Sequence, residues 1–162
     1  MQEKDFIDPE ILKNGNVLLL LKQRFIENRS VETIFPLLCC LRDSQVIVPV
    51  NVTMSKEDEE MFLHAKKGDT VTTSGNIRMK PDILQNGDAF FFPMFSNAEQ
   101  MPEDYAAKFS NINMSVPQCI KMAKTYDKVI GLVLDAFTDP VVLEYQLADI
   151  IPRLESRLKP EE

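Results

Sequence analysis

Residues 83–96 contain a hairpin signal that constrains the fold of this chain more than any other stretch. Asn86 and Gly87 form an Asn-Gly pair, a strong signal for a two-residue type I′ turn, which needs positive φ at both central residues. The strand after the turn is almost entirely apolar, as expected of a central strand covered on both faces. Ser96 with Glu99 three residues later has the form of a capping box, so a helix is predicted to follow. The second strand of this hairpin is therefore predicted to lie at the centre of a sheet.

The length and composition predict one soluble domain. The chain has 162 residues, of which 44% are hydrophobic and 27% are charged, enough for a core of ordinary size. Its formal charge of −7 and isoelectric point of 4.8 argue against nucleic acid and anionic membranes as partners, because both attract clustered Lys and Arg. Solubility is the simplest explanation of this charge, and a basic protein partner is the alternative.

Neither a membrane span nor a signal peptide is predicted. No segment has the roughly 20 consecutive apolar residues that a spanning helix needs. The first five residues carry charges of both signs and lack the apolar region of a signal peptide. The chain has three cysteines, Cys39, Cys40 and Cys119. Their number is odd, and Cys39 and Cys40 are adjacent in the sequence, which favours reduced, buried thiols over disulfides. We therefore expect a cytoplasmic location.

The N-terminal part of the chain predicts an antiparallel pair of helices. The first covers residues 11–27, with Asn16 as an N-cap candidate from which the regular helix begins. The second covers residues 31–42, with Ser30 as its N-cap. Pro36 either lies inside this second helix or marks the first turn of a shorter one.

Strands and helices are predicted to follow in mixed order, giving a single α+β domain over residues 1–162 with a core from about 17 to 151. The sheet is predicted to be mixed or antiparallel, with about five to six strands and with helices packed on it. Pro49 suggests an edge strand or a bulge, and Pro152 is expected to kink or end the last helix. The predicted strands cover 45–52, 70–79, the hairpin arms 83–85 and 88–95, 111–114, 129–134 and 140–143. A short helix is predicted from 97, with a restart at 101–103 that runs through 109, and further helices cover 116–125 and 144–158. Residues 55–67 are predicted to be a loop or a short exposed helix.

The candidate site of this chain lies at the ends of its two most apolar strands. Ser96 follows one of these strands and Asp135 follows the other. If the strands are parallel neighbours, both side chains project at one edge of the sheet, where ligands of α/β proteins bind. With their aromatic neighbours, they define a candidate partner or ligand site made of Phe95, Ser96, Asp135 and Phe137. The simpler interpretation is that Ser96 caps a helix and Asp135 opens a turn.

No catalytic, metal or cofactor site is predicted elsewhere. His64 is the only histidine, and a surface position is a simpler interpretation than a nucleophilic pair with a cysteine. Cys39 and Cys40 lack the Cys-x-x-Cys spacing of metal and redox sites. The acidic run 57–60 lacks the ligand spacing and glycine of a calcium loop. The glycines are isolated, so no phosphate-binding loop is predicted.

The order of landmarks resembles the SseB N-terminal domain family, named for enhanced serine sensitivity in bacteria. The landmarks are a Val-Pro-Val strand at 48–50, a hairpin ending in an aromatic-Pro-x-Phe motif at 87–96, a Gly-hydrophobic strand at 131–135 and an apolar pair at 142–143. The resemblance covers residues 17–151. Two positions depart from the family pattern, because Phe95-Ser96-Asn97 stands where Phe-Thr-Ser is usual and Asp135-Ala136 stands where Asn-Pro is usual. The resemblance implies the fold and carries no agreed enzymatic activity.

Three functional hypotheses follow from these observations. The first is a non-enzymatic cytoplasmic protein-interaction module that binds protein partners through an exposed sheet edge or helix face. The second is a small acidic secretion-type chaperone or regulator that works as a homodimer. The third is a small-molecule binder or enzyme that uses Ser96 and Asp135. An exposed apolar patch favours the first two hypotheses, and a deep pocket lined by these two residues favours the third.

Overall fold

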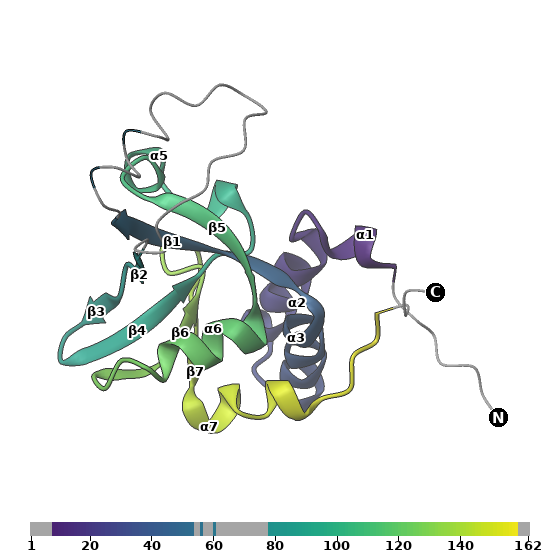
Figure 1. Cartoon of the computed structure of the whole chain (residues 1–162). Coiled ribbons are helices and arrows are strands. Elements are labelled where there is room, and N and C mark those ends of the chain that lie inside the picture. Colours follow the sequence, from purple (N-terminus) through teal and green to yellow (C-terminus); the bar gives the residue numbers. More distant parts are fainter. Residues whose placement is uncertain (1–7, 54–55, 57–59, 61–77, 159–162) are drawn as a thin grey trace.

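The computed structural model describes residues 8–53, 56, 60 and 78–158 (Figure 1). Almost all of the predicted exposed segment 55–67 lies outside these residues, and so do His64 and most of the predicted strand 70–79.

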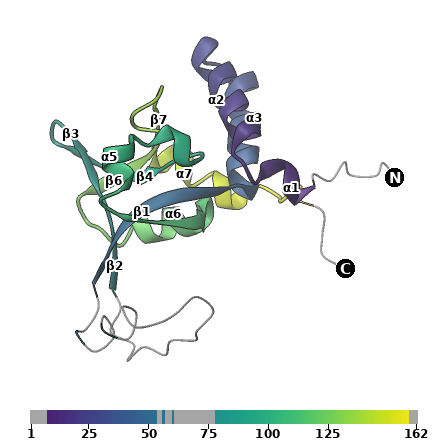
Figure 2. The same cartoon turned by 90° about the horizontal axis from the view of Figure 1, so that it is seen from above.

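The N-terminal helices form the predicted antiparallel pair. After the short helix α1 (Pro9–Leu12) come α2 (Asn16–Glu27) and α3 (Val31–Asp43), which lie side by side at one end of the sheets (Figure 2). Ser30 caps α3 as predicted, in a capping box with Thr33. The N-cap of α2 is Gly15 rather than Asn16, because Gly15 takes the left-handed φ of +74° that turns the chain into the helix.

The first sheet has three antiparallel strands in the order β2-β1-β5. They are β1 (Gln45–Thr53), β2 (Arg78–Pro81) and β5 (Ser110–Ser115). β1 is the central strand, which differs from the edge position that Pro49 suggested. Pro49 lies opposite Asn111 of β5, but the backbone groups of Ile47, two residues earlier, bond Phe95 on the side away from β5, so position 49 also faces away from β5. On that side β2 pairs only from Val50 onward, so no strand needs an N–H group at position 49.

The second sheet has four strands in the order β3-β4-β6-β7. They are β3 (Leu84–Asn86), β4 (Ala89–Met94), β6 (Val129–Leu134) and β7 (Val141–Glu144). β4 and β6 are parallel neighbours at the centre, the arrangement on which the candidate site depends, and the other pairs are antiparallel.

The α+β fold class is confirmed, although the described strands form two sheets instead of one. The two sheets meet at a single bridge, where Ile47 and Phe95 exchange backbone hydrogen bonds of 2.8 and 2.9 Å. Hydrogen-bonded pairs recur every second residue along an antiparallel ladder, so the next pair in this register would be Pro49 with Pro93. Neither proline has an N–H group, so the ladder stops after one bridge.

The hairpin forms where it was predicted, but its turn lies one residue later. Asn86 pairs with Ala89, which makes Gly87 and Asp88 the central residues of the turn. Gly87 has a φ of +62° and Asp88 does not have a positive φ, so the predicted type I′ turn is wrong. Positive φ at the first central residue alone is the pattern of a type II′ turn.

The remaining helices are short. The 3₁₀ helix η1 (Ala98–Gln100) and helix α5 (Glu103–Ala106) correspond to the predicted short helix from Asn97 and its restart at 101–103, although α5 ends before the predicted end at Phe109. α6 (Val116–Ala123) has the predicted capping box of Ser115 and Gln118. The predicted closing helix 144–158 ends early, as Pro152 suggested. It consists of α7 (Tyr145–Ala148) and the separate 3₁₀ helix η2 (Ile151–Arg153), because Pro152 prevents a continuous helix.

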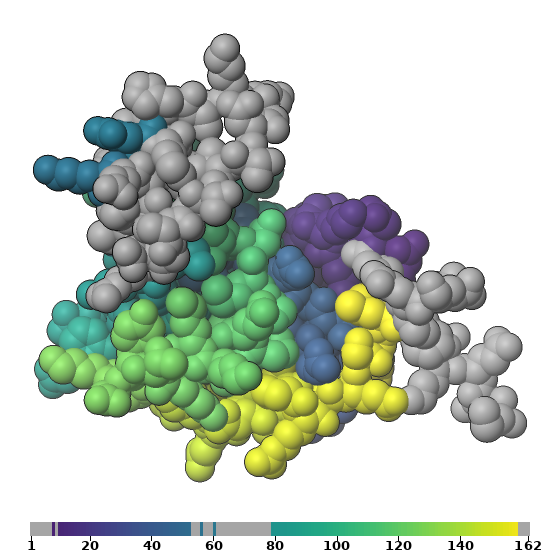
Figure 3. All heavy atoms as spheres, in the orientation of Figure 1, coloured from purple at the N-terminus to yellow at the C-terminus, as the bar shows by residue number. Residues whose placement is uncertain are grey.

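One hydrophobic core joins both sheets to the helices. α6 packs against β4, β6 and α3. The C-terminal segment is tied to the end of α3 by hydrogen bonds from Arg42 Nε to the Leu154 carbonyl (3.1 Å) and from the Arg157 N–H to Asp43 Oδ2 (2.8 Å). Figure 3 shows α3 on one face between the first helices and this segment. Buried core residues include Leu18, Leu37, Leu41, Val46, Val48, Phe92, Met94, Cys119, Leu132 and Leu134.

Among the described residues, no helix combines the length and the apolar character that a bilayer crossing requires.

Candidate functional site

Ser96 and Asp135 meet at the ends of β4 and β6, as the parallel arrangement predicts. The Ser96 N–H donates to Asp135 Oδ1 at 2.8 Å, and Ser96 Oγ donates to Asp135 Oδ2 at 2.6 Å. Ser96 does not form the predicted capping box, because its hydroxyl is used by Asp135. Asn97 caps η1 instead, accepting a hydrogen bond from the Glu99 N–H.

Lys22 of α2 completes this buried contact. Its Nζ lies 2.9 Å from Asp135 Oδ2 and 2.7 Å from the carbonyl oxygen of Thr138. The side chains of Lys22 and Asp135 are 5% and 0% exposed. Breaking a buried ion pair by removing one partner costs about 3–5 kcal/mol, because the remaining charge is left without compensation. The sequence analysis missed Lys22, although a lysine four residues after Leu18 on the apolar face of a helix was a signal for a buried partner.

The start of α2 is held against the same strand end. A β-carbon on Gly15 would lie 2.3 Å from the Ser96 carbonyl oxygen, so only glycine permits this approach. Asn97 Nδ2 donates to the Asn14 carbonyl at 3.1 Å. These contacts position α2 so that Lys22, two turns later, reaches Asp135.

Asp135 also shapes the turn that follows β6. Its φ is +56°, a left-handed conformation that Asp tolerates better than most residues. Its N–H donates to the Met94 carbonyl at 2.8 Å, and its own carbonyl accepts from the Thr138 N–H at 3.0 Å. The turn is thus fixed on both sides, and it places Phe137 at the surface with 47% of the residue exposed.

Phe137 belongs to a cluster of four aromatic rings, which we call the aromatic ledge and define as Phe95, Tyr105, Phe109 and Phe137. Phe137 stacks on the fully buried Phe95, with centroids 6.0 Å apart and an interplanar angle of 7°. The ring of Tyr105 meets Phe137 edge-on at 4.9 Å and lies 5.1 Å from Phe109. Such pairs are worth about 0.5–1.5 kcal/mol beyond area burial, so the exposed ring is held in a defined orientation.

Tyr105 is fixed at its polar end as well. Its hydroxyl donates to Asp82 Oδ2 at 2.6 Å. Burial, followed by this hydrogen bond, raises the pKa of Tyr105 well above its ordinary value. The ledge is therefore anchored by Tyr105 on one side and by the Asp135 turn on the other.

A groove of about 270 Å³ lies along α2, with the two residues that follow Phe137 in its lining, and we call it the α2 groove. Thr138 Oγ1, on its wall, donates to Gln100 Oε1 at 2.6 Å. The groove is lined by Leu19, Lys22, Gln23, Ile26, Gln100, Thr138 and Asp139.

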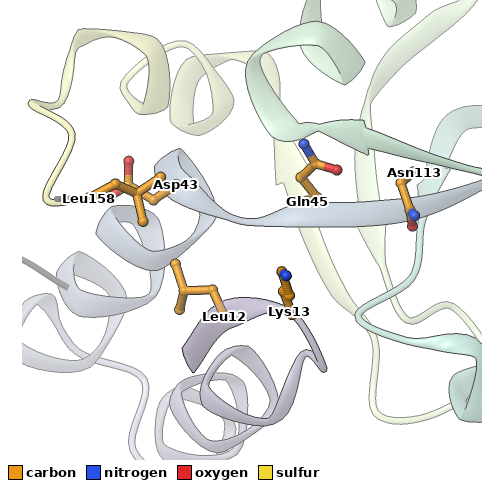
Figure 4. Close-up of a pocket in the computed structure, with 6 residues that line it drawn as sticks. All are labelled: Leu12, Lys13, Asp43, Gln45, Asn113 and Leu158. Carbon is orange, nitrogen blue, oxygen red and sulfur yellow. The ribbon is translucent and has the colours of Figure 1, made fainter. Parts of the chain in front are cut away.

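A second hollow, of about 450 Å³, lies between α1, the end of α3, β1 and β5 (Figure 4). Lys13, Gln45 and Asn113 contribute exposed side chains to it, so it is an open depression. Asp43 also lines it. Asp43 Oδ1 is buried without a hydrogen-bond partner, while Oδ2 accepts from the Arg157 N–H.

The cysteines and acidic residues show no second centre in the part of the chain that the structure describes. Cys39, Cys40 and Cys119 are free thiols, and burial raises the pKa of Cys40 and of Cys119. No group of three or more His, Cys, Asp or Glu side chains in the described residues could hold a metal ion.

Ser96 and Asp135 hold the ends of β4 and β6 and the helix α2 together. Ser96 is 4% exposed and Asp135 is 0% exposed, so neither meets a ligand directly in this arrangement. The carboxylate is already used by Lys22 and by two donors of Ser96. Of the four predicted site residues, Phe95, Ser96 and Asp135 are buried supports and Phe137 is the exposed one.

Comparison with models of protein families, with curated proteins and with solved protein structures gives no match.

Proposed function

We propose that this chain is a protein-interaction module whose aromatic ledge binds a peptide segment of a partner protein. One observation carries the proposal: Phe137 is half exposed, yet its ring is stacked on a buried phenylalanine and its backbone is fixed by the buried Lys22–Asp135 contact. An exposed aromatic ring held in this way loses little conformational freedom when a partner covers it, which favours binding.

Other exposed apolar residues give weaker support for binding. Val31 and Phe35 are 76% and 47% exposed and lie one turn apart on α3. Within the described residues, Phe35 has no aromatic ring packed against it, so its side chain is less restrained than that of Phe137. Phe35 therefore provides a matched control for an exposed phenylalanine.

The proposal also covers the location of the protein and whether it is an enzyme. We infer a cytoplasmic, non-enzymatic role, in keeping with the resemblance to the SseB N-terminal domain family.

Selection from a phage-displayed peptide library, followed by affinity measurement with the selected peptides, tests the function. Phe137→Ala is expected to weaken binding by at least about tenfold, since exposed aromatic anchors dominate such interfaces. Phe35→Ala is expected to leave the affinity unchanged, and urea unfolding checks that both variants fold. Equal affinity of Phe137→Ala and the original protein, or a library that yields no binder, would overturn the proposal.

A further inference from the structure

We infer that the bound segment carries a lysine or arginine next to the apolar residue that packs on Phe137, and that this basic side chain occupies the α2 groove with its charge at Asp139. The inference rests on the proposed function and adds the chemistry of the partner.

The α2 groove has the size and position for such a side chain. It is lined by Thr138 and Asp139, which directly follow Phe137, so one short segment of a partner can reach both the ring and the groove. Leu19 and Ile26 supply apolar surface for the methylene groups of a lysine or arginine. Asp139 is exposed, and it makes no ion pair with any residue in the described ranges.

The positive charge of Lys22 does not repel a second cation from the groove. Its ammonium is paired with Asp135 at 2.9 Å and with the Thr138 carbonyl at 2.7 Å, so the carboxylate compensates its charge. The charge that remains on the groove wall is that of Asp139. A basic side chain is therefore the complementary occupant.

The surface around the aromatic ledge carries a net negative charge, as Asp139 does. The exposed charged residues at 97–109 and 137–139 are four acidic ones and one basic one: Glu99, Glu103, Asp104 and Asp139 against Lys108. Such a surface attracts a basic segment and disfavours an acidic one, with a dependence on salt concentration.

The experiment uses peptides selected from the phage library against the whole chain. They are expected to carry Lys or Arg beside an aromatic or aliphatic residue. Asp139→Asn preserves the left-handed φ of +49°, which Asn also tolerates, and removes the charge. This variant is expected to weaken binding about three- to tenfold, with the loss shrinking at high salt as expected for a charge pair at an interface rim. Asp127→Asn, at an exposed position in another turn, is the charge-matched control and is expected to bind normally.

The outcomes separate the two proposals. If Phe137→Ala abolishes binding while Asp139→Asn binds as the original protein does, the basic-residue inference is wrong and the interaction function stands. The same conclusion follows if the selected peptides lack basic residues. If Phe137→Ala binds normally, both proposals fail. Weaker binding by each of the two variants, and weaker binding of a peptide whose basic residue is replaced by glutamine, support both proposals.

Discussion

Gly15 packs directly against the backbone of Ser96. A β-carbon at position 15 would lie 2.3 Å from the Ser96 carbonyl oxygen and 2.9 Å from its carbonyl carbon. This contact sets where α2 begins, and so it determines that Lys22 reaches Asp135 at the end of β6. The turn that presents Phe137 thus depends on a residue 122 positions earlier in the chain.

Gly15→Ala is expected to destabilise the protein more than Gly87→Ala. Both positions have positive φ, which costs a residue with a side chain about 1–2 kcal/mol. A β-carbon at position 87 meets nothing within 4 Å, whereas one at position 15 clashes and adds about 1–3 kcal/mol. Urea unfolding measures the difference, and equal losses for the two variants would show that the close contact with Ser96 is unimportant.

Lys22→Met is expected to lower the free energy of unfolding by about 3–5 kcal/mol, because it leaves the buried Asp135 carboxylate without its cation. The double variant Lys22→Met/Asp135→Asn should lose less than the sum of the single losses, because neither charge remains. Lys124→Met is the control, since the Lys124–Asp149 pair is largely exposed and worth at most about 1 kcal/mol. Additive losses at Lys22 and Asp135 would contradict the coupling.

The stability of the protein is expected to fall as the pH rises above about 10, in part because of Tyr105. Burial and the Asp82 hydrogen bond raise the pKa of Tyr105 in the folded state, so the unfolded chain loses this proton first. The stabilisation is therefore fully present below the unfolded pKa and is lost above it. Tyr105→Phe should show a smaller slope of the unfolding free energy against pH in this range. An unchanged slope would mean that the Tyr105 hydroxyl is exposed to solvent in the folded protein.

Cys39 is expected to react with a thiol reagent in the folded protein before the other two cysteines. Cys39 is partly exposed, whereas Cys40 and Cys119 are buried and burial raises their pKa, which lowers the fraction of reactive thiolate. Cys39→Ser should remove the fast phase of labelling in a spectrophotometric thiol assay. A fast phase that survives this substitution would assign the accessible thiol to another cysteine.

The patterns of apolar residues predicted the central part of the fold correctly. The apolar run of β4 predicts a central strand because burial on both faces requires such a run, and β4 lies between β3 and β6 in its sheet. Ser115 with Gln118 predicted the start of α6 because a capping box is a local interaction.

The features that the sequence did not predict depend on contacts between residues far apart in the chain. Ser96 had a complete local explanation as a cap, yet its hydroxyl bonds Asp135, 39 residues later. Lys22 and Gly15 act through partners in other elements, so no local pattern assigned them a role. Pro49 and Pro93 divide the sheet only through the register set by Ile47 and Phe95, which a single sequence does not contain.

Amide chemical-shift mapping by NMR tests the proposed binding surface most directly. A selected peptide is titrated into the isotopically labelled chain, and the shifted amide signals are assigned to residues. We predict that the shifts concentrate at residues 95–109 and 135–139 and on the side of α2 that carries Leu19 and Ile26. Shifts that instead concentrate around Val31 and Phe35 on α3, with residues 135–139 unaffected, would contradict the account.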